Sequence, residues 1–135
     1  MKTGSRRRGE RGQGLLELAL VTPLLLLLCM SIVDLGRLLF VYVAIEEAAQ
    51  EGALYGANVP GVEMDIIDRV KSSSLAPEVA DADVDVACPG PVAGTIRVEV
   101  TYPVPLITPF VGQLFGGTWT VGTDVIANIV SGSCP

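Results

Sequence analysis

The stretch that decides the fold runs from Gly12 to Ala57 and reads GQGLLELALVTPLLLLLCMSIVDLGRLLFVYVAIEEAAQEGALYGA. No charged residue lies between Leu18 and Val33, and residues 24–28 are five consecutive leucines. Because roughly 20 apolar residues of helix cross the hydrocarbon core, this run is long enough to span a membrane. It is longer than the apolar region of a signal peptide and lacks a small-residue cleavage site after it, so we expect the span to be retained.

The charges on the two sides of the span differ in sign. Ahead of Gly12, five basic residues stand against one acidic residue, a net charge of +4, whereas beyond Arg37 three bases stand against twelve acids, a net charge of −9. Since clustered Lys and Arg stay in the cytoplasm, we predict a single-pass protein with its N-terminus inside and its acidic part outside. A short arginine cluster next to a span is typical of a topology signal in contact with lipid, and no nucleic-acid partner is expected.

The helical pattern continues beyond the span and then stops. Apolar and small residues keep helical spacing as far as Tyr55, and Gly56, Asn58, Pro60 and Gly61 indicate an end. We therefore divide the chain into a basic cytoplasmic leader, 1–12, a long helix, 13–57, that spans the membrane in its first half, and a small extracytoplasmic domain, 58–135.

The remaining sequence predicts a second helix and three strands. A short helix is expected from Val62 or Glu63 to Ser73, and alternating apolar and polar residues indicate half-buried strands near 82–88, 96–102 and 119–129. The expected fold class is α+β, pilin-like, with a three-stranded antiparallel sheet packed on the outer half of the long helix.

Residues 103–117, PVPLITPFVGQLFGG, are apolar and interrupted by proline. The pattern is too irregular for a strand, so we expect a connection between the last two strands. Such an apolar segment fits either a loop at the membrane surface or a patch for a partner subunit.

Residues that could carry chemistry are few. The chain has no histidine and no recognised catalytic or phosphate-binding motif, so we expect neither an enzyme, nor a cofactor, nor a small-molecule substrate. The alternating acids Asp81, Asp83 and Asp85 are expected to form a solvated strand face rather than a metal site, with Arg97 neutralising one of them across the hairpin.

Two further pairs are predicted from position. Cys88 and Cys134 fall in the exported part, where oxidation is allowed, and we expect them to form a disulfide. Asp34 and Arg37 stand at i and i+3 of the long helix, so they share a face, and we expect them to pair with each other at the outer headgroup layer.

Glu17 is the one carboxylate inside the apolar run. A charged group there is costly unless it is paired, which makes it a functional candidate, although pairing with Arg11 or a lipid amine at the cytoplasmic headgroups is the simpler alternative. A basic leader, a glycine, and a glutamate five residues after it resemble the leader of type IV prepilins and pseudopilins. Among the glycines near this end, Gly4, Gly9, Gly12 and Gly14, only Gly12 has an acid five residues on.

The match sharpens along the helix. The string from Arg11 to Ala57 resembles the TadE-like family of tight-adherence pilus assembly proteins. The corresponding residues are Gly12, Gln13, Glu17, Pro23, Asp34, Gly36, Arg37, Ala48, Ala49, Glu51, Gly52 and Ala53.

The resemblance implies a function in pilus assembly. It implies cleavage by a prepilin peptidase between Gly12 and Gln13, and partners among other pilins or pseudopilins and the inner-membrane assembly platform. It also implies a place in a bacterial or archaeal cytoplasmic membrane or in a surface pilus. Glu17 would give the N-terminal ammonium of a neighbouring subunit its counter-charge, with Asp34 and Arg37 available to a partner helix. The alternative is an unprocessed single-pass protein whose outer domain binds a ligand or secreted partner.

Overall fold

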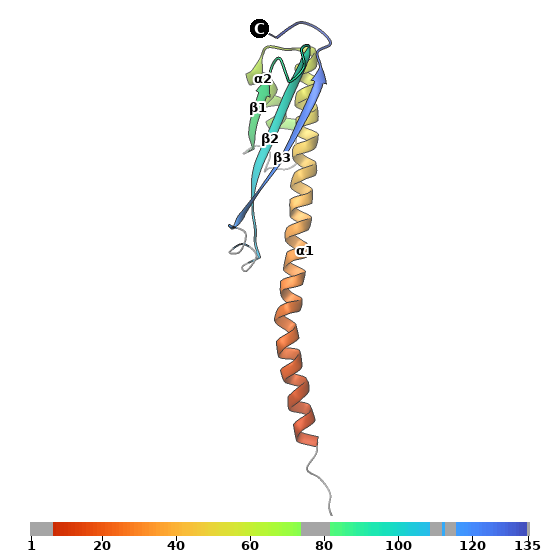
Figure 1. The fold of residues 1–135 in the computed structure, drawn as a ribbon, viewed down its shortest axis with the longest axis vertical. Helices are drawn as coiled ribbons and strands as arrows, with labels where there is room; N and C mark the ends of the chain where they lie inside the picture. Colours follow the sequence, from red (N-terminus) through yellow and green to blue (C-terminus); the bar gives the residue numbers. More distant parts are fainter. Residues whose placement is uncertain (1–6, 74–81, 109–111, 113–115, 135) are drawn as a thin grey trace, which may run out of the picture.

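A single long helix forms the axis of the molecule. The computed structural model describes residues 7–73, 82–108, 112 and 116–134. Helix α1 (Arg7–Asn58) has 52 residues, which corresponds to about 78 Å at 1.5 Å per residue. Figure 1 shows every other element beside the C-terminal half of α1, and the N-terminal half standing alone. The predicted helix 13–57 lies within α1, which begins inside the predicted leader.

The other elements confirm the predicted α+β class. Helix α2 (Glu63–Ser73) packs against α1 and is followed by strands β1 (Asp83–Ala87), β2 (Thr95–Pro105) and β3 (Thr118–Asn128). The strands form one antiparallel sheet in the order β1-β2-β3. One face of this sheet covers the outer half of α1, as expected from its alternating sequence.

The core lies between this sheet, α2 and one stripe of α1. The buried apolar residues of the stripe recur every three or four positions, as one face of a helix requires: Val41, Ala44, Ile45, Ala48, Ala49, Ala53 and Ala57. Strand β2 contributes Ile96, Val98, Val100 and Val104. Small residues on α1 bring the elements close together, since a Cβ added to Gly56 would lie 2.6 Å from Cδ1 of Ile96.

Gly56 therefore has a different role from the predicted one. It is a buried packing position two residues before α1 ends at Asn58, so the helix does end within the predicted cluster, and it is Gly61, with φ 100°, that takes the left-handed conformation after it. The carbonyls of the last turn of α1 accept hydrogen bonds from the residue after the helix and from the C-terminal segment: Val59 N donates to Tyr55 O at 3.0 Å and Val130 N to Ala57 O at 2.8 Å. Ser131 Oγ donates to the carbonyl of Asn58 at 2.6 Å. These bonds satisfy carbonyls that a helix end leaves without partners.

Strand β2 continues through two prolines that the sequence pattern assigned to an irregular connection. β1 begins at Asp83, opposite Thr101, so among the described residues β2 pairs beyond that point with β3 alone. On the β3 side, Leu106 N donates a hydrogen bond to the carbonyl of Gly117, the residue before β3, at 3.0 Å. Backbone N–H groups of successive residues in a strand point to opposite sides. The N–H of Leu106 points towards β3, so the nitrogens of Pro103 and Pro105 lie on the other side, where no strand bond requires the N–H that proline lacks.

The register also corrects the predicted partner of Arg97. Arg97 lies opposite Ala87, while Glu99 lies opposite Asp85 on one side and Asp124 on the other. The guanidinium accordingly pairs with Glu99 at 2.9 Å and with Asp124 at 3.5 Å. The predicted pairing of Arg97 with Asp83 or Asp85 is wrong, because alternation in the sequence does not give the strand register; Asp81 lies outside the described residues.

Candidate functional site

The N-terminal half of α1 is exposed and apolar. From Gly12 to Val33 all side chains are exposed except those of Leu27 and Ser31, which are half-buried. Within the described residues, α1 is the one helix long and apolar enough to cross a membrane. The hydroxyl of Ser31 donates to the carbonyl of Leu27 at 2.9 Å, so the helix itself satisfies that polar group on a surface suited to lipid.

The predicted cleavage and assembly residues lie on this exposed segment. Gly12 and Gln13 are exposed and helical, and a Cβ added to Gly12 would meet no atom within 4 Å. Glu17 is exposed one turn further on, and no hydrogen bond or ion pair joins it to another described residue. The side chain of Arg11, its predicted alternative partner, lies outside the described part. The helix continues through Pro23.

Among the described side chains of α1, Asp34 is the first that is buried, and it binds a segment of the outer domain. Its side chain is 7% exposed. Oδ1 accepts a hydrogen bond from the backbone N of Ile107 at 3.1 Å, and Oδ2 accepts bonds from Thr108 N at 2.9 Å and Thr108 Oγ1 at 2.5 Å. One turn later, Arg37 donates from a guanidinium nitrogen to the carbonyl of Pro105 at 3.3 Å. We call these interactions the Asp34 contact.

The Asp34 contact replaces the pair that the sequence predicted. Asp34 and Arg37 are not among the ion pairs of the described residues. Each of them instead forms hydrogen bonds with residues 105–108. Asp34 is also buried beneath that segment rather than open to solvent. The spacing correctly put both side chains on one face of α1, but the binding groups there are backbone atoms of a distant segment.

The open edge of β2 explains why the segment needs α1. The carbonyl of Pro105 and the N–H of Ile107 lie on the side of β2 where no described strand pairs beyond Thr101, and Arg37 and Asp34 supply their partners. Asp34 meets three donors and no acceptor, an arrangement that an ionised carboxylate satisfies with both oxygens. Because bonds to a charged group are stronger than neutral ones, this contact fixes the end of the hairpin on the helix.

Ile107 and Thr108 were not among the residues that the sequence singled out. The available signal is weak: Thr108 is a hydroxyl residue in a segment that is otherwise apolar from Val104 to Val111. In the structure Thr108 is 1% exposed, and a buried hydroxyl needs a partner. That requirement points to a polar residue elsewhere in the chain without saying which one.

The remaining candidates lie away from the Asp34 contact. Cys88 and Cys134 are joined by a disulfide, with their Cα atoms 5.5 Å apart. Asp83 and Asp85 are exposed on β1, while Asp81 falls outside the described residues. Cys29 is a free, exposed thiol in the apolar segment.

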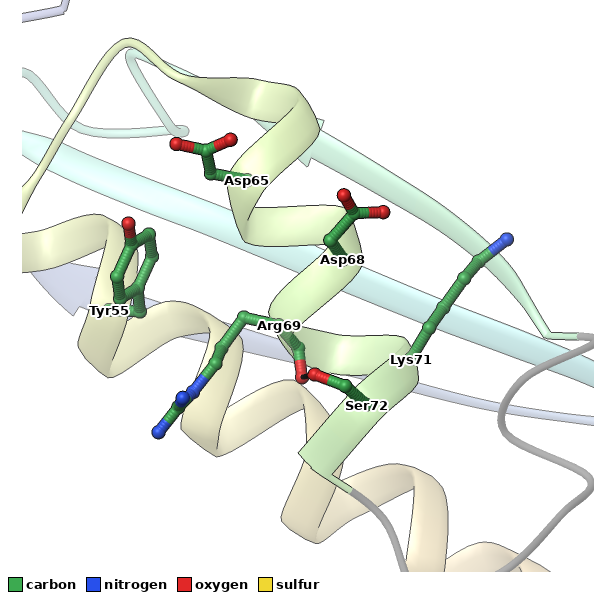
Figure 2. Close-up of a pocket in the computed structure, with 6 residues that line it drawn as sticks. All are labelled: Tyr55, Asp65, Asp68, Arg69, Lys71 and Ser72. Carbon is green, nitrogen blue, oxygen red and sulfur yellow. Dashed lines mark hydrogen bonds between the residues drawn. The ribbon is translucent and has the colours of Figure 1, made fainter.

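A shallow depression lies between the outer end of α1 and α2 (Figure 2). It is lined by Tyr55, Asp65, Asp68, Arg69, Lys71 and Ser72. Arg69 is held by Glu51 of α1, and in Figure 2 the Arg69 and Lys71 side chains extend in opposite directions. The charged groups do not converge on one point, as a ligand site would require.

A family model described as TadE-like protein matches residues 12–54. This confirms the resemblance to the TadE-like family over about a third of the chain. No curated protein and no solved structure matches the chain. The matched segment contains Gly12, Glu17, Asp34 and Arg37, but it ends before residues 105–108, the partners in the Asp34 contact. The match suggests a membrane-anchored subunit related to the Tad pilus.

Proposed function

We propose that this protein is a pilin-like, TadE-like subunit that is anchored in the cytoplasmic membrane and takes part in assembling a tight-adherence pilus. The observation that carries the proposal is α1 itself. Its first half is exposed and apolar, its second half carries the outer domain, and the family match covers both halves up to residue 54. The basic N-terminus lies inside and the acidic domain outside, according to the charge asymmetry.

Processing after Gly12 is the second part of the proposal. Gly12 is exposed, with open space where a side chain would stand. Gly9 and Gly14 flank it, and each glycine inside a helix costs about 1 kcal/mol relative to alanine. The N-terminal end of α1 is therefore inexpensive to unwind, which supports access by a membrane peptidase. Cleavage there places a new ammonium group on Gln13.

Glu17 then serves as the acceptor for the ammonium group of a neighbouring subunit. An unpaired carboxylate in lipid costs a few kcal/mol, and within the described residues Glu17 has no partner of its own. A counter-charge from a second helix removes this cost and fixes the axial register of the two helices. The partner would be another pilin or pseudopilin in the same membrane.

The N-terminus of the membrane-resident protein tests processing. In cells that contain a prepilin peptidase we expect the mature chain to begin at Gln13, and in cells without it at Met1 or Lys2. Gly12→Leu should block the shift, whereas Gly14→Leu, a matched change two residues on, should leave it in place. N-terminal sequencing reads the result. A Met1 or Lys2 start with the peptidase present would favour the unprocessed membrane-anchored binding or scaffold protein.

Glu17→Gln tests the assembly role. Neutralising the carboxylate removes the counter-charge but keeps the size of the side chain, so we expect co-purification with partner pilins to fall at least tenfold, equivalent to about 1.4 kcal/mol. Glu47→Gln is the matched control, because Glu47 is an exposed carboxylate on the same helix beyond the apolar segment. Equal recovery of partners with both variants would exclude the proposed pairing of Glu17.

A further inference from the structure

The far end of the β2–β3 hairpin exposes large apolar side chains. Ile107 is 59% exposed and Trp119 is 53% exposed. The two belong to the same end of the hairpin, because Trp119 lies opposite Val104 in the register. Figure 1 shows this end reaching along α1 towards its N-terminal half, away from the chain's C-terminus.

The Asp34 contact sets the height of this end along α1. Asp34 is the first buried residue after the exposed segment 12–33, and it binds the backbone of Ile107 directly. Counting roughly 20 residues from Leu15, the length needed to cross the hydrocarbon core, reaches Asp34. The exposed apolar end of the hairpin therefore stands beside the outer end of the span.

Charge is absent from this part of the chain. Residues 100–123 include no charged residue, and the charged groups of β2 and β3, Arg97, Glu99 and Asp124, all lie nearer the other end of the hairpin. This distribution separates a charged part of the sheet, which suits water, from an uncharged end. A surface in contact with water alone does not require charged and uncharged residues to be separated in this way.

The backbone at this end is also provided with partners. Leu106 N donates to Gly117 O, and Ile107 N and Thr108 N donate to Asp34. The carbonyl of Pro105 accepts from Arg37. Non-helical backbone approaches lipid only when its polar groups are satisfied by protein, because each unsatisfied group costs several kcal/mol there.

From these observations we infer that the end of the β2–β3 hairpin, defined by its exposed residues Ile107 and Trp119, contacts the outer leaflet of the same membrane that α1 spans. Trp119 lies at the headgroup level, where tryptophan is enriched in membrane proteins. Lipid is the occupant because it surrounds the span on which the Asp34 contact fixes the hairpin. The inference depends on α1 lying in the membrane; it does not depend on cleavage at Gly12 or on pilus assembly.

Trp119 is the only tryptophan in the chain, so its fluorescence reports this contact without interference. The full-length protein is reconstituted in phosphatidylcholine–phosphatidylglycerol vesicles with and without brominated acyl chains. We expect the brominated lipid to reduce the emission by about twofold, as for a tryptophan at the membrane interface. We also expect acrylamide, a quencher dissolved in water, to quench Trp119 less in vesicles than in the same protein unfolded in urea without detergent.

The control moves the reporter along the same strand and, because the step is an odd number of residues, onto the other face of the sheet. In the variant Trp119→Phe with Ile126→Trp, the tryptophan stands seven residues further from the hairpin end, about 23 Å at 3.3 Å per residue. Ile126 is 50% exposed, so the new side chain has room. We expect its emission to be insensitive to brominated lipid and strongly quenched by acrylamide.

Two outcomes would overturn the inference. Equal quenching of the two tryptophans by brominated lipid would show that Trp119 lies no nearer to the membrane than Ile126 does. Shielding of Trp119 from acrylamide with no quenching by brominated lipid would assign the surface to a second protein molecule. Repeating the measurement at several protein-to-lipid ratios separates the cases, because contact with lipid does not depend on protein density.

Discussion

Replacing Asp34 with asparagine is expected to release the end of the hairpin from α1. The amide keeps the size of the side chain, but its NH2 group replaces one of the two oxygens that now face three donors. Hydrogen bonds to a charged group contribute about 1.5 to 3 kcal/mol each, and a buried donor left without a partner costs about 1 to 3 kcal/mol. We therefore expect the amides of Ile107 and Thr108 to exchange hydrogen at least thirtyfold faster, or about 2 kcal/mol of lost protection.

Hydrogen exchange of the full chain in detergent micelles, measured on peptides covering residues 103–108, tests this expectation. Thr108→Val removes only the hydroxyl bond and should give a smaller acceleration. Glu47→Gln, a change in an exposed carboxylate on the same helix, should leave the exchange as it is in the unaltered protein. If Asp34→Asn behaved like Glu47→Gln, the carboxylate would not be what holds the hairpin.

Reducing the disulfide between Cys88 and Cys134 is expected to lower the stability of the outer domain by about 2 to 4 kcal/mol. The two cysteines are 46 residues apart in sequence, so the bond closes a long loop and restricts the unfolded chain. It also holds the C-terminal segment whose Val130 and Ser131 bind the last carbonyls of α1. We expect Tm to fall by about 10 to 20 °C on reduction, given 4 to 8 °C per kcal/mol for a domain of this size.

Thermal unfolding in detergent with and without reductant measures the difference. The background should carry Cys29→Ser, because Cys29 is a free thiol that would otherwise respond to the same conditions. The double variant Cys88→Ser with Cys134→Ser should unfold at the lower temperature and ignore the reductant. An unchanged Tm on reduction, or two free thiols in the mass spectrum of the native protein, would contradict the expected linkage.

The elements were predictable where the sequence repeats with a clear period. The run from Leu15 to Val33 predicted the first half of α1 by its length as an apolar segment, and the stripe that ends near Ala57 predicted the second half by its helical spacing. The alternation around Val84, Val98 and Val125 predicted the strands. The continuation of β2 through Pro103 and Pro105 was not predictable, since proline is acceptable there because β1 begins only opposite Thr101 and no described strand pairs with β2 on that side beyond it.

The candidate site divides in the same way. Glu17 stands out because one acid in an apolar run is conspicuous from the sequence alone. The partners of Asp34 lie 73 and 74 residues away, and no local pattern links a helix carboxylate to Ile107 and Thr108. The assignment of Arg97 likewise needed the strand register, because alternation gives the face of a side chain but not its neighbour across the sheet.

The position of Asp34 has a mechanical consequence. The outer domain binds α1 from the first residue after the exposed segment, so no flexible linker separates the two. A helix that moves out of lipid by one residue rises about 1.5 Å and, if it follows its own thread, turns by about 100°. The sheet must rise and turn with it as one rigid body. A force applied to the outer domain is therefore transmitted directly to the span. Asp34 and Arg37 are the contacts nearest to the span through which it is transmitted.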